Sequence, residues 1–88
     1  MDVKMAIRLR VKCHDQVLDA AKAVTARSGK NEFSIAEIVS ELAMAGSHYA
    51  ESTIRTHVVS RCCANAPNHH AVVYDYFERI DRGLYRVR

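Results

Sequence analysis

The chain of 88 residues is 49% hydrophobic and 26% charged, a composition typical of one folded domain rather than of a disordered segment. A domain of this length buries only about 60% of its unfolded surface, which argues against a large cofactor cleft or an elaborate active site. The net charge of +3 permits a polyanionic partner without requiring one. No apolar run approaches the ~18 residues of a membrane span and no signal-peptide pattern opens the chain, so we expect a cytoplasmic protein without membrane association.

The charge is unevenly distributed along the chain. In residues 1–30, seven basic side chains against three acidic ones give +4. Residues 31–45 carry three glutamates and no base, and residues 46–88 carry six arginines against four acids. We therefore expect the acidic middle segment to face away from any polyanion and the two ends to approach it.

The first patterned segment is an alternation of apolar and polar residues over 3–11. A period of two predicts a strand with one buried and one basic face. The alternative is the start of a longer helix, because the residue types present also favour helices. We treat residues 1–12 as an N-terminal extension containing this strand and residues 13–88 as one domain. A strand with an apolar face could pair with its twin, so residues 3–11 are also the predicted contact of a homodimer.

Two helices are expected next. Residues 14–28 place apolar side chains on one face, with Asp15 as the candidate N-cap and Gly29 as the stop signal. The second helix has the stronger start signal, because Ser34 is followed three residues later by Glu37, the spacing of a capping box. The flanking apolar residues Phe33 and Ile38 have the spacing of a hydrophobic staple, and Gly46 ends the helix about 11 residues on.

A third helix is expected from near Glu51 to near Asn65, before Pro67. Two helices joined by a short turn that contains glycine indicate a helix-turn-helix arrangement. At about 100° per residue, Cys63 falls on the outward side of the third helix. The inward side carries Ile54, Val58, Cys62, Arg61 and Asn65.

The outward side of this helix is rich in short hydroxyl side chains. Such side chains let a helix enter a major groove and donate to phosphates or base edges. An ordinary solvated face would instead carry Glu and Lys. The residues concerned are Ser52, Thr53, Thr56 and Ser60, with Arg55 at the edge.

The C-terminal part reads as a hairpin. Residues 72–80 have strand composition, Asp81-Arg82-Gly83 suits a turn with a left-handed glycine, and residues 84–87 form the return strand. Tyr85 and Val87 are expected to pack inward with Phe77 or Ile80. Arg82 at the tip is the natural phosphate contact. Further candidates are His69 and His70 in the preceding loop and Arg79 and Arg86 on the strands. The alternative for these two arginines is that they are solubilising edge charges, which is the favoured interpretation for Arg79.

With these elements in place, residues 14–88 resemble a winged helix-turn-helix domain. The segments that carry the resemblance are residues 33–39, 49–58 and 77–87, the last of which is similar to the usual wing. The chain is similar to small bacterial winged-helix modules that occur alone or beside restriction-type nuclease domains.

The resemblance implies an α+β fold with a recognition helix at about 51–65 and a wing at 77–87. It implies duplex DNA as the partner, in transcription regulation or restriction and modification. The family's usual DNA contacts carry over to Ser52, Thr53, Arg55, Thr56, Ser60 and Arg82. Winged helices also include protein-interaction modules, so a protein-binding or dimerisation role is the alternative.

Other functions receive less support from the residues. Adjacent Cys62 and Cys63 would point about 100° apart on a helix, which disfavours a metal site. With Cys13 they make an odd count, typical of free thiols in a reducing compartment. No nucleophile has an evident base and orienting carboxylate, so we expect neither catalysis nor a cofactor. Tyr74 and Tyr76 would suit a reader of methylated bases if their rings were exposed, although such rings more often fill a core.

Overall fold

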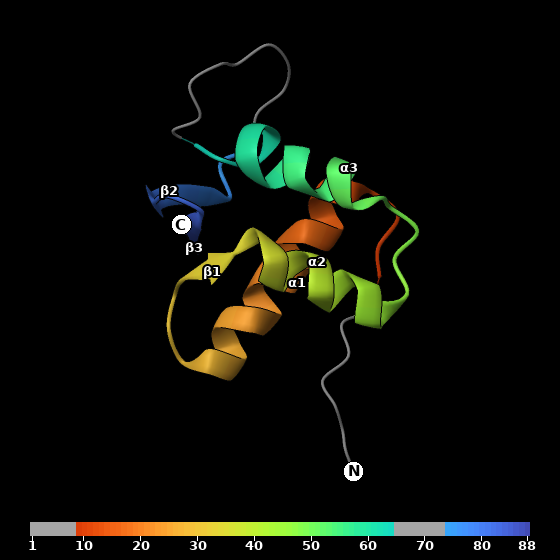
Figure 1. Ribbon diagram of the computed structural model, residues 1–88, viewed down its shortest axis with the longest axis horizontal. Helices are drawn as coiled ribbons and strands as arrows, with labels where there is room; N and C mark the ends of the chain where they lie inside the picture. Colours follow the sequence, from red (N-terminus) through yellow and green to blue (C-terminus); the bar gives the residue numbers. More distant parts are fainter. Residues whose placement is uncertain (1–8, 65–73) are drawn as a thin grey trace.

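The structure is a computed structural model that describes residues 9–64 and 74–88. It is a small α+β domain with three helices and a three-stranded antiparallel sheet, which confirms the predicted α+β class (Figure 1). The third helix is continuous but changes from α to π winding at His57. In chain order the elements are α1 (Cys13–Ser28), β1 (Phe33–Ser34), α2 (Ile35–Ala45), α3 (Glu51–Thr56), η1 (His57–Arg61), β2 (Phe77–Asp81) and β3 (Leu84–Val87).

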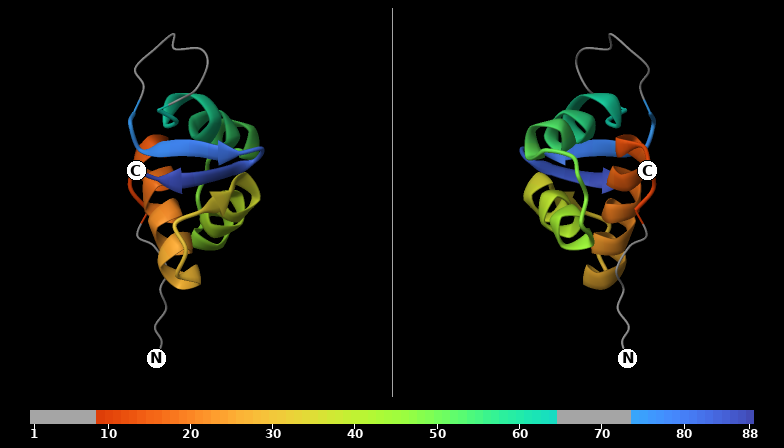
Figure 2. Two further views of the ribbon diagram at one scale, coloured as in Figure 1. Left: turned by 90° about the vertical axis from the view of Figure 1, so that its left-hand side faces the viewer. Right: turned by 90° about the vertical axis from the view of Figure 1, so that its right-hand side faces the viewer.

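The sheet joins the hairpin to the segment before α2. Its strand order is β1-β3-β2, with both pairs antiparallel. Figure 2 shows the β2–β3 hairpin between β1 and the α3–η1 helix, with its turn on the same side of the molecule as α3 and its open end beside α1. The sheet therefore fixes the position of the hairpin turn relative to α3.

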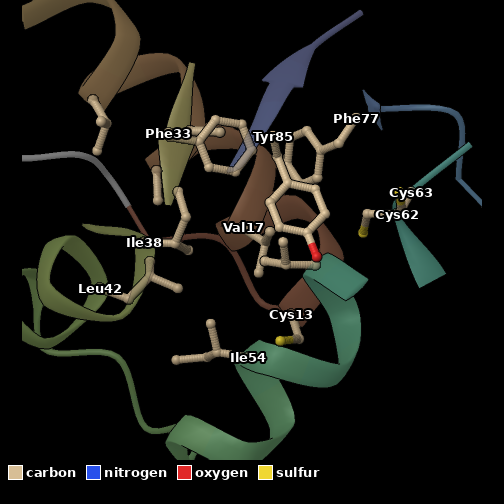
Figure 3. Packing of buried hydrophobic residues seen from close by; sticks show 14 residues of the cluster. Cys13, Val17, Phe33, Ile38, Leu42, Ile54, Cys62, Cys63, Phe77 and Tyr85 are labelled. Atoms are coloured by element: carbon tan, nitrogen blue, oxygen red, sulfur yellow. The ribbon is translucent and has the colours of Figure 1, made fainter. Parts of the chain in front are cut away.

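The core lies between this sheet and the three helices. Phe33 and Phe77 are fully buried and meet edge to face, with ring centroids 4.9 Å apart. Tyr85 stacks on Phe33 at 6.0 Å and directs its hydroxyl toward the α3–η1 helix (Figure 3). The helices contribute smaller buried side chains, among them Val17, Ile38, Leu42, Ile54, Val58 and Cys62. Such burial is the main source of stability in a domain this small.

The start of α2 is as the sequence predicts. The Ser34 hydroxyl oxygen accepts from the Glu37 backbone N–H at 3.2 Å, and the Glu37 carboxylate accepts from the Ser34 backbone N–H at 2.8 Å. Phe33 and Ile38 are both fully buried. The helix ends at Gly46, whose φ of 86° is left-handed. The capping box and the glycine stop are therefore confirmed.

Ser34→Ala is expected to lower the free energy of unfolding by about 1 kcal/mol, because it removes the side-chain acceptor of the capping box. Urea denaturation followed by circular dichroism measures the change. Ser40→Ala is the matched control on the exposed face of the same helix, where alanine is the better helix former and no loss is expected. Equal stability of the two variants would contradict the role of the cap.

The start of α1 differs from the sequence prediction. The helix begins at Cys13, its N-cap is Lys12 with no side-chain cap, and Asp15 lies in the first turn. Asp15 is instead 3.8 Å from the Arg10 guanidinium. An acid in the first turn still suits the positive end of the helix. The predicted end at Gly29, with a φ of 77°, is confirmed.

The predicted N-terminal strand is wrong where it can be compared with the structure. Residues 1–8 lie outside the described part of the chain, and residues 9–12 form no helix or strand. Val11 is 87% exposed. Two backbone carbonyls of this segment accept hydrogen bonds from side chains: Gln16 donates to the Arg10 carbonyl, and the Tyr49 hydroxyl donates to the Val11 carbonyl at 2.9 Å. Homodimer formation through residues 3–11 stays a prediction.

The third helix and the following strand are both shorter than predicted. The helix ends at Arg61, while Asn65 lies outside the described residues. Strand β2 begins at Phe77 rather than at 72; residues 72 and 73 are not described, and residues 74–76 are not in a strand. In the hairpin, Tyr85 is buried as expected, whereas Ile80 is 41% exposed at a register shift in β2. None of the helices in the described ranges is long and apolar enough to cross a membrane.

Candidate nucleic-acid interface

The outward face of α3 carries the short hydroxyl side chains that the helical projection placed there. Ser52, Arg55 and Thr56 are exposed, and Thr53 and Ser60 are partly exposed. The opposite face is buried through Ile54, Val58 and Cys62, as predicted. The helix thus presents a narrow polar surface made of small groups and one guanidinium.

Hydrogen bonds hold part of this surface in place. The Thr56 hydroxyl donates to the Ser52 backbone carbonyl at 3.0 Å, so its oxygen lone pairs remain to accept a bond from a ligand. The Arg55 guanidinium pairs with Glu51 at 3.3 Å, one turn back. Both side chains of this pair are more than half exposed, and such a pair contributes only about 0.3–0.5 kcal/mol. Arg55 can therefore exchange Glu51 for a ligand at small cost.

A shallow concavity lies beside these residues. Its volume is about 430 Å³ and it is lined by Ser52, Thr53, Thr56, His57 and Arg61. His57 Nδ1 lies 2.9 Å from the Thr53 carbonyl oxygen, which fixes the ring. Sequence reasoning missed His57 and placed Arg61 on the inward side, whereas Arg61 is exposed. The predicted inward position of Arg61 is wrong because the helix changes to a π turn at His57, and no pattern in the sequence predicted that turn.

The hairpin places its arginines in different environments. Arg86 is bonded to Glu78 on the facing strand at 2.7 Å, so its charge is compensated locally. The Arg79 Nε donates to the Asp81 carbonyl at 3.3 Å. Arg82 is exposed in the turn, where its backbone N–H donates to the Asp81 carboxylate at 2.7 Å. Within the described ranges the Arg82 guanidinium forms no ion pair, so it is the hairpin cation best placed for a ligand.

The α3–η1 helix and the hairpin approach each other around the buried side chain of Tyr85. Burial raises the pKa of the Tyr85 hydroxyl, the Cys63 thiol adds to the rise, and the charges of Arg79 and Arg55 oppose it. The charges of one arginine from β2 and one from α3 therefore both act on the Tyr85 hydroxyl. The backbone of the hairpin turn and that of α3 lie on the same side of the molecule (Figure 2).

The three cysteines are free and buried. Cys62 faces inward as predicted, and burial together with neighbouring thiols raises its pKa to about 12. The prediction that Cys63 is exposed or half-exposed is wrong, because it is 1% exposed. After Cys62 the chain leaves the helix and bridges β2, where the Phe77 N–H donates to the Cys62 carbonyl at 2.8 Å. In the part of the chain that the structure describes, no cluster of three or more His, Cys, Asp or Glu could hold a metal ion.

Two other candidate groups lie outside this surface or outside the described residues. His69 and His70 are not described. Tyr74 and Tyr76 stack on each other with centroids 5.5 Å apart, and His14 stacks on Tyr74 at 4.0 Å. The stack accounts for both partly buried tyrosine rings without a bound base. We therefore propose no reading of modified bases.

The fold and its exposed residues define a small α+β domain with a hydroxyl-rich helix face and an exposed arginine in the hairpin turn. The chain belongs to the family described as a domain of unknown function (DUF7669), whose model matches residues 14–87. That match extends from α1 through β3. No curated protein and no solved structure matches the chain.

Proposed function

We propose that this domain binds duplex DNA as a winged helix-turn-helix, with the α3–η1 helix in the major groove and the β2–β3 hairpin on the backbone. The observation that carries the proposal is the exposed, hydroxyl-rich face of the α3–η1 helix with its concavity, and an exposed arginine at the hairpin turn supports it. The order of helices and strands and the β1-β3-β2 sheet are compatible with this fold. Transcription regulation and restriction or modification are the settings in which such a module would act.

The turn between α2 and α3 supports the proposal because two side-chain hydrogen bonds connect it to other parts of the chain. The Ser47 hydroxyl donates to the buried Gln16 side-chain oxygen at 2.7 Å, which ties the turn to α1. The Tyr49 hydroxyl bonds the backbone of the segment that precedes α1. A recognition helix gains affinity when it is positioned before binding, since less conformational freedom is lost in the complex.

The residues divide into two roles under this proposal. Ser52, Thr56 and Arg55 would meet base edges and adjacent phosphates, because they are the exposed side chains of the helix face. Arg82 would contact a phosphate beside the groove, where it adds affinity without sequence information. Glu37 lies in the first turn of α2, a different element from the proposed recognition helix.

Fluorescence anisotropy with a labelled random-sequence duplex tests the proposal. The full chain should bind at low salt, and the affinity should fall steeply toward physiological salt because binding releases counterions from the DNA. An absence of binding at low salt would overturn the proposal. That result would favour a protein-interaction role, and deletion of residues 1–12 would be the first test of that role.

Arg82→Ala is expected to weaken binding to all duplex sequences alike and to reduce the slope of log affinity against log salt by about one, the effect of losing one phosphate contact. The same anisotropy titrations at several salt concentrations measure it. Arg86→Ala is the matched control on the same hairpin, and it should change affinity by less than about twofold because Glu78 already compensates that charge. A sequence-dependent loss in Arg82→Ala would contradict the backbone role.

A further inference from the structure

The change from α to π winding at His57 decides where Arg61 lies. The Cys62 N–H donates to the His57 carbonyl at 2.8 Å, a bond across five residues, whereas the Ile54 N–H donates to Ala50 across four at 3.1 Å. A helix closed across five residues turns through less than the about 100° per residue of an α-helix. Uninterrupted α winding would place Arg61 beside Ile54 on the inward side of the helix. The smaller rotation per residue in the π turn places Arg61 on the side of Thr53 and His57 instead.

The contacts agree with this rotation. Thr53, His57 and Arg61 follow at intervals of four residues and line the same concavity, with Ser52 and Thr56 beside them. The same turn leaves Val58 and Cys62 fully buried. A π turn thus keeps two core residues inside and adds a guanidinium to the polar face. Single π turns in proteins are frequent at functional sites.

The concavity has the chemistry of a phosphate site. Its lining comprises a guanidinium, an imidazole and three hydroxyl groups, and no carboxylate is among the described residues that line it. Among the described residues no acid pairs with Arg61, unlike Arg55 and Arg86. Because His57 Nδ1 is engaged by the Thr53 carbonyl, Nε2 is the ring nitrogen that remains for a ligand. Guanidinium groups and hydroxyls together suit the several acceptor oxygens of a phosphate.

We propose that this concavity, the Arg61 site, holds one backbone phosphate of the bound duplex. The inference rests on the proposed function. It assigns a DNA contact to Thr53, His57 and Arg61, to which the proposed function gives no role. Arg61 supplies affinity rather than sequence preference, and Thr53 and His57 orient the phosphate. With Arg82 at the hairpin turn, the Arg61 site gives the domain a backbone contact from each of its two DNA-facing elements.

Nuclear magnetic resonance of the full chain titrated with millimolar inorganic phosphate tests the site without DNA. In the wild-type chain, the resonances of Thr53, His57 and Arg61 should shift, and in Arg61→Gln these shifts should disappear. Lys30→Gln is the matched control, because Lys30 is an exposed cation just beyond the far end of α1 and should leave the shifts unchanged. An absence of shifts at these three residues in the wild-type chain would overturn the site.

Anisotropy with duplexes of several sequences tests its assignment to DNA. Arg61→Gln should lose about tenfold in affinity for every duplex and reduce the salt slope by about one, while Lys30→Gln behaves like wild type. Duplex binding with unchanged affinity and slope in Arg61→Gln would overturn the Arg61 site and leave the proposed function standing. A wild-type chain whose three resonances respond to phosphate but which binds no duplex would overturn the proposed function and, with it, the assignment to DNA.

Discussion

Phe77→Ala is expected to lower the free energy of unfolding by about 3–5 kcal/mol, a large part of the total for a domain of this size. The side chain is fully buried and meets Phe33 edge to face at 4.9 Å. The residue is also where the helix end joins the sheet, because its N–H donates to Cys62 and its carbonyl accepts from Ala64, each at 2.8 Å. Removing the ring therefore leaves a cavity at the joint between η1 and β2.

Urea denaturation of the wild-type chain and the variant measures this loss. Ile80→Ala is the matched control on the same strand, because Ile80 is 41% exposed and its truncation should cost about 0.5 kcal/mol. A similar cost for the two substitutions would show that the core is not centred on the junction between helix and sheet. Since Phe77 anchors the strand that leads to the hairpin turn, the variant should also bind DNA less well at temperatures where it is partly unfolded.

Arg55→Ala is expected to weaken binding to the preferred DNA site by about 1–3 kcal/mol and to relax sequence preference at one position, the result of losing a base contact. The substitution should barely change stability, because the exposed pair with Glu51 contributes only about 0.3–0.5 kcal/mol. This combination separates a DNA contact from a structural role.

Selection from a random duplex pool with the wild-type chain and with the variant measures the preference, and anisotropy on the selected site measures the affinity. Lys22→Ala removes the same charge from the exposed side of α1 and should leave both unchanged. A selected motif and an affinity identical to wild type in Arg55→Ala would remove this residue from the interface.

Several features of the fold were predictable because residues close together in the sequence determine them. The capping box needs only Ser34 and Glu37 three residues apart, and both are bonded as expected. The glycines at positions 29, 46 and 83 have positive φ angles, which residues with a Cβ atom rarely adopt. The 3.6-residue period likewise placed Ser52, Arg55 and Thr56 on the surface.

Features that depend on distant contacts were not predictable from local patterns. The alternation over residues 3–11 predicted a strand, but in its described part the backbone carbonyls of Arg10 and Val11 accept hydrogen bonds from side chains of α1 and of the turn before α3. Cys63 is buried because the chain after Cys62 pairs with β2. The π turn over His57–Arg61 lies directly before this junction, and a uniform helical projection placed Arg61 on the inward side because it assumes α winding throughout.

The most direct test of the central claim is a map of the surface that the full chain uses to bind a duplex. Amide chemical shifts measured during titration with a short duplex should change on the outward face of the α3–η1 helix and at the hairpin turn, above all at Ser52, Thr56, Arg61 and Arg82. The exposed side of α1, including Lys22, should stay unchanged. Shifts concentrated on α1, or no shifts at a duplex concentration that saturates the anisotropy signal, would contradict the proposed docking.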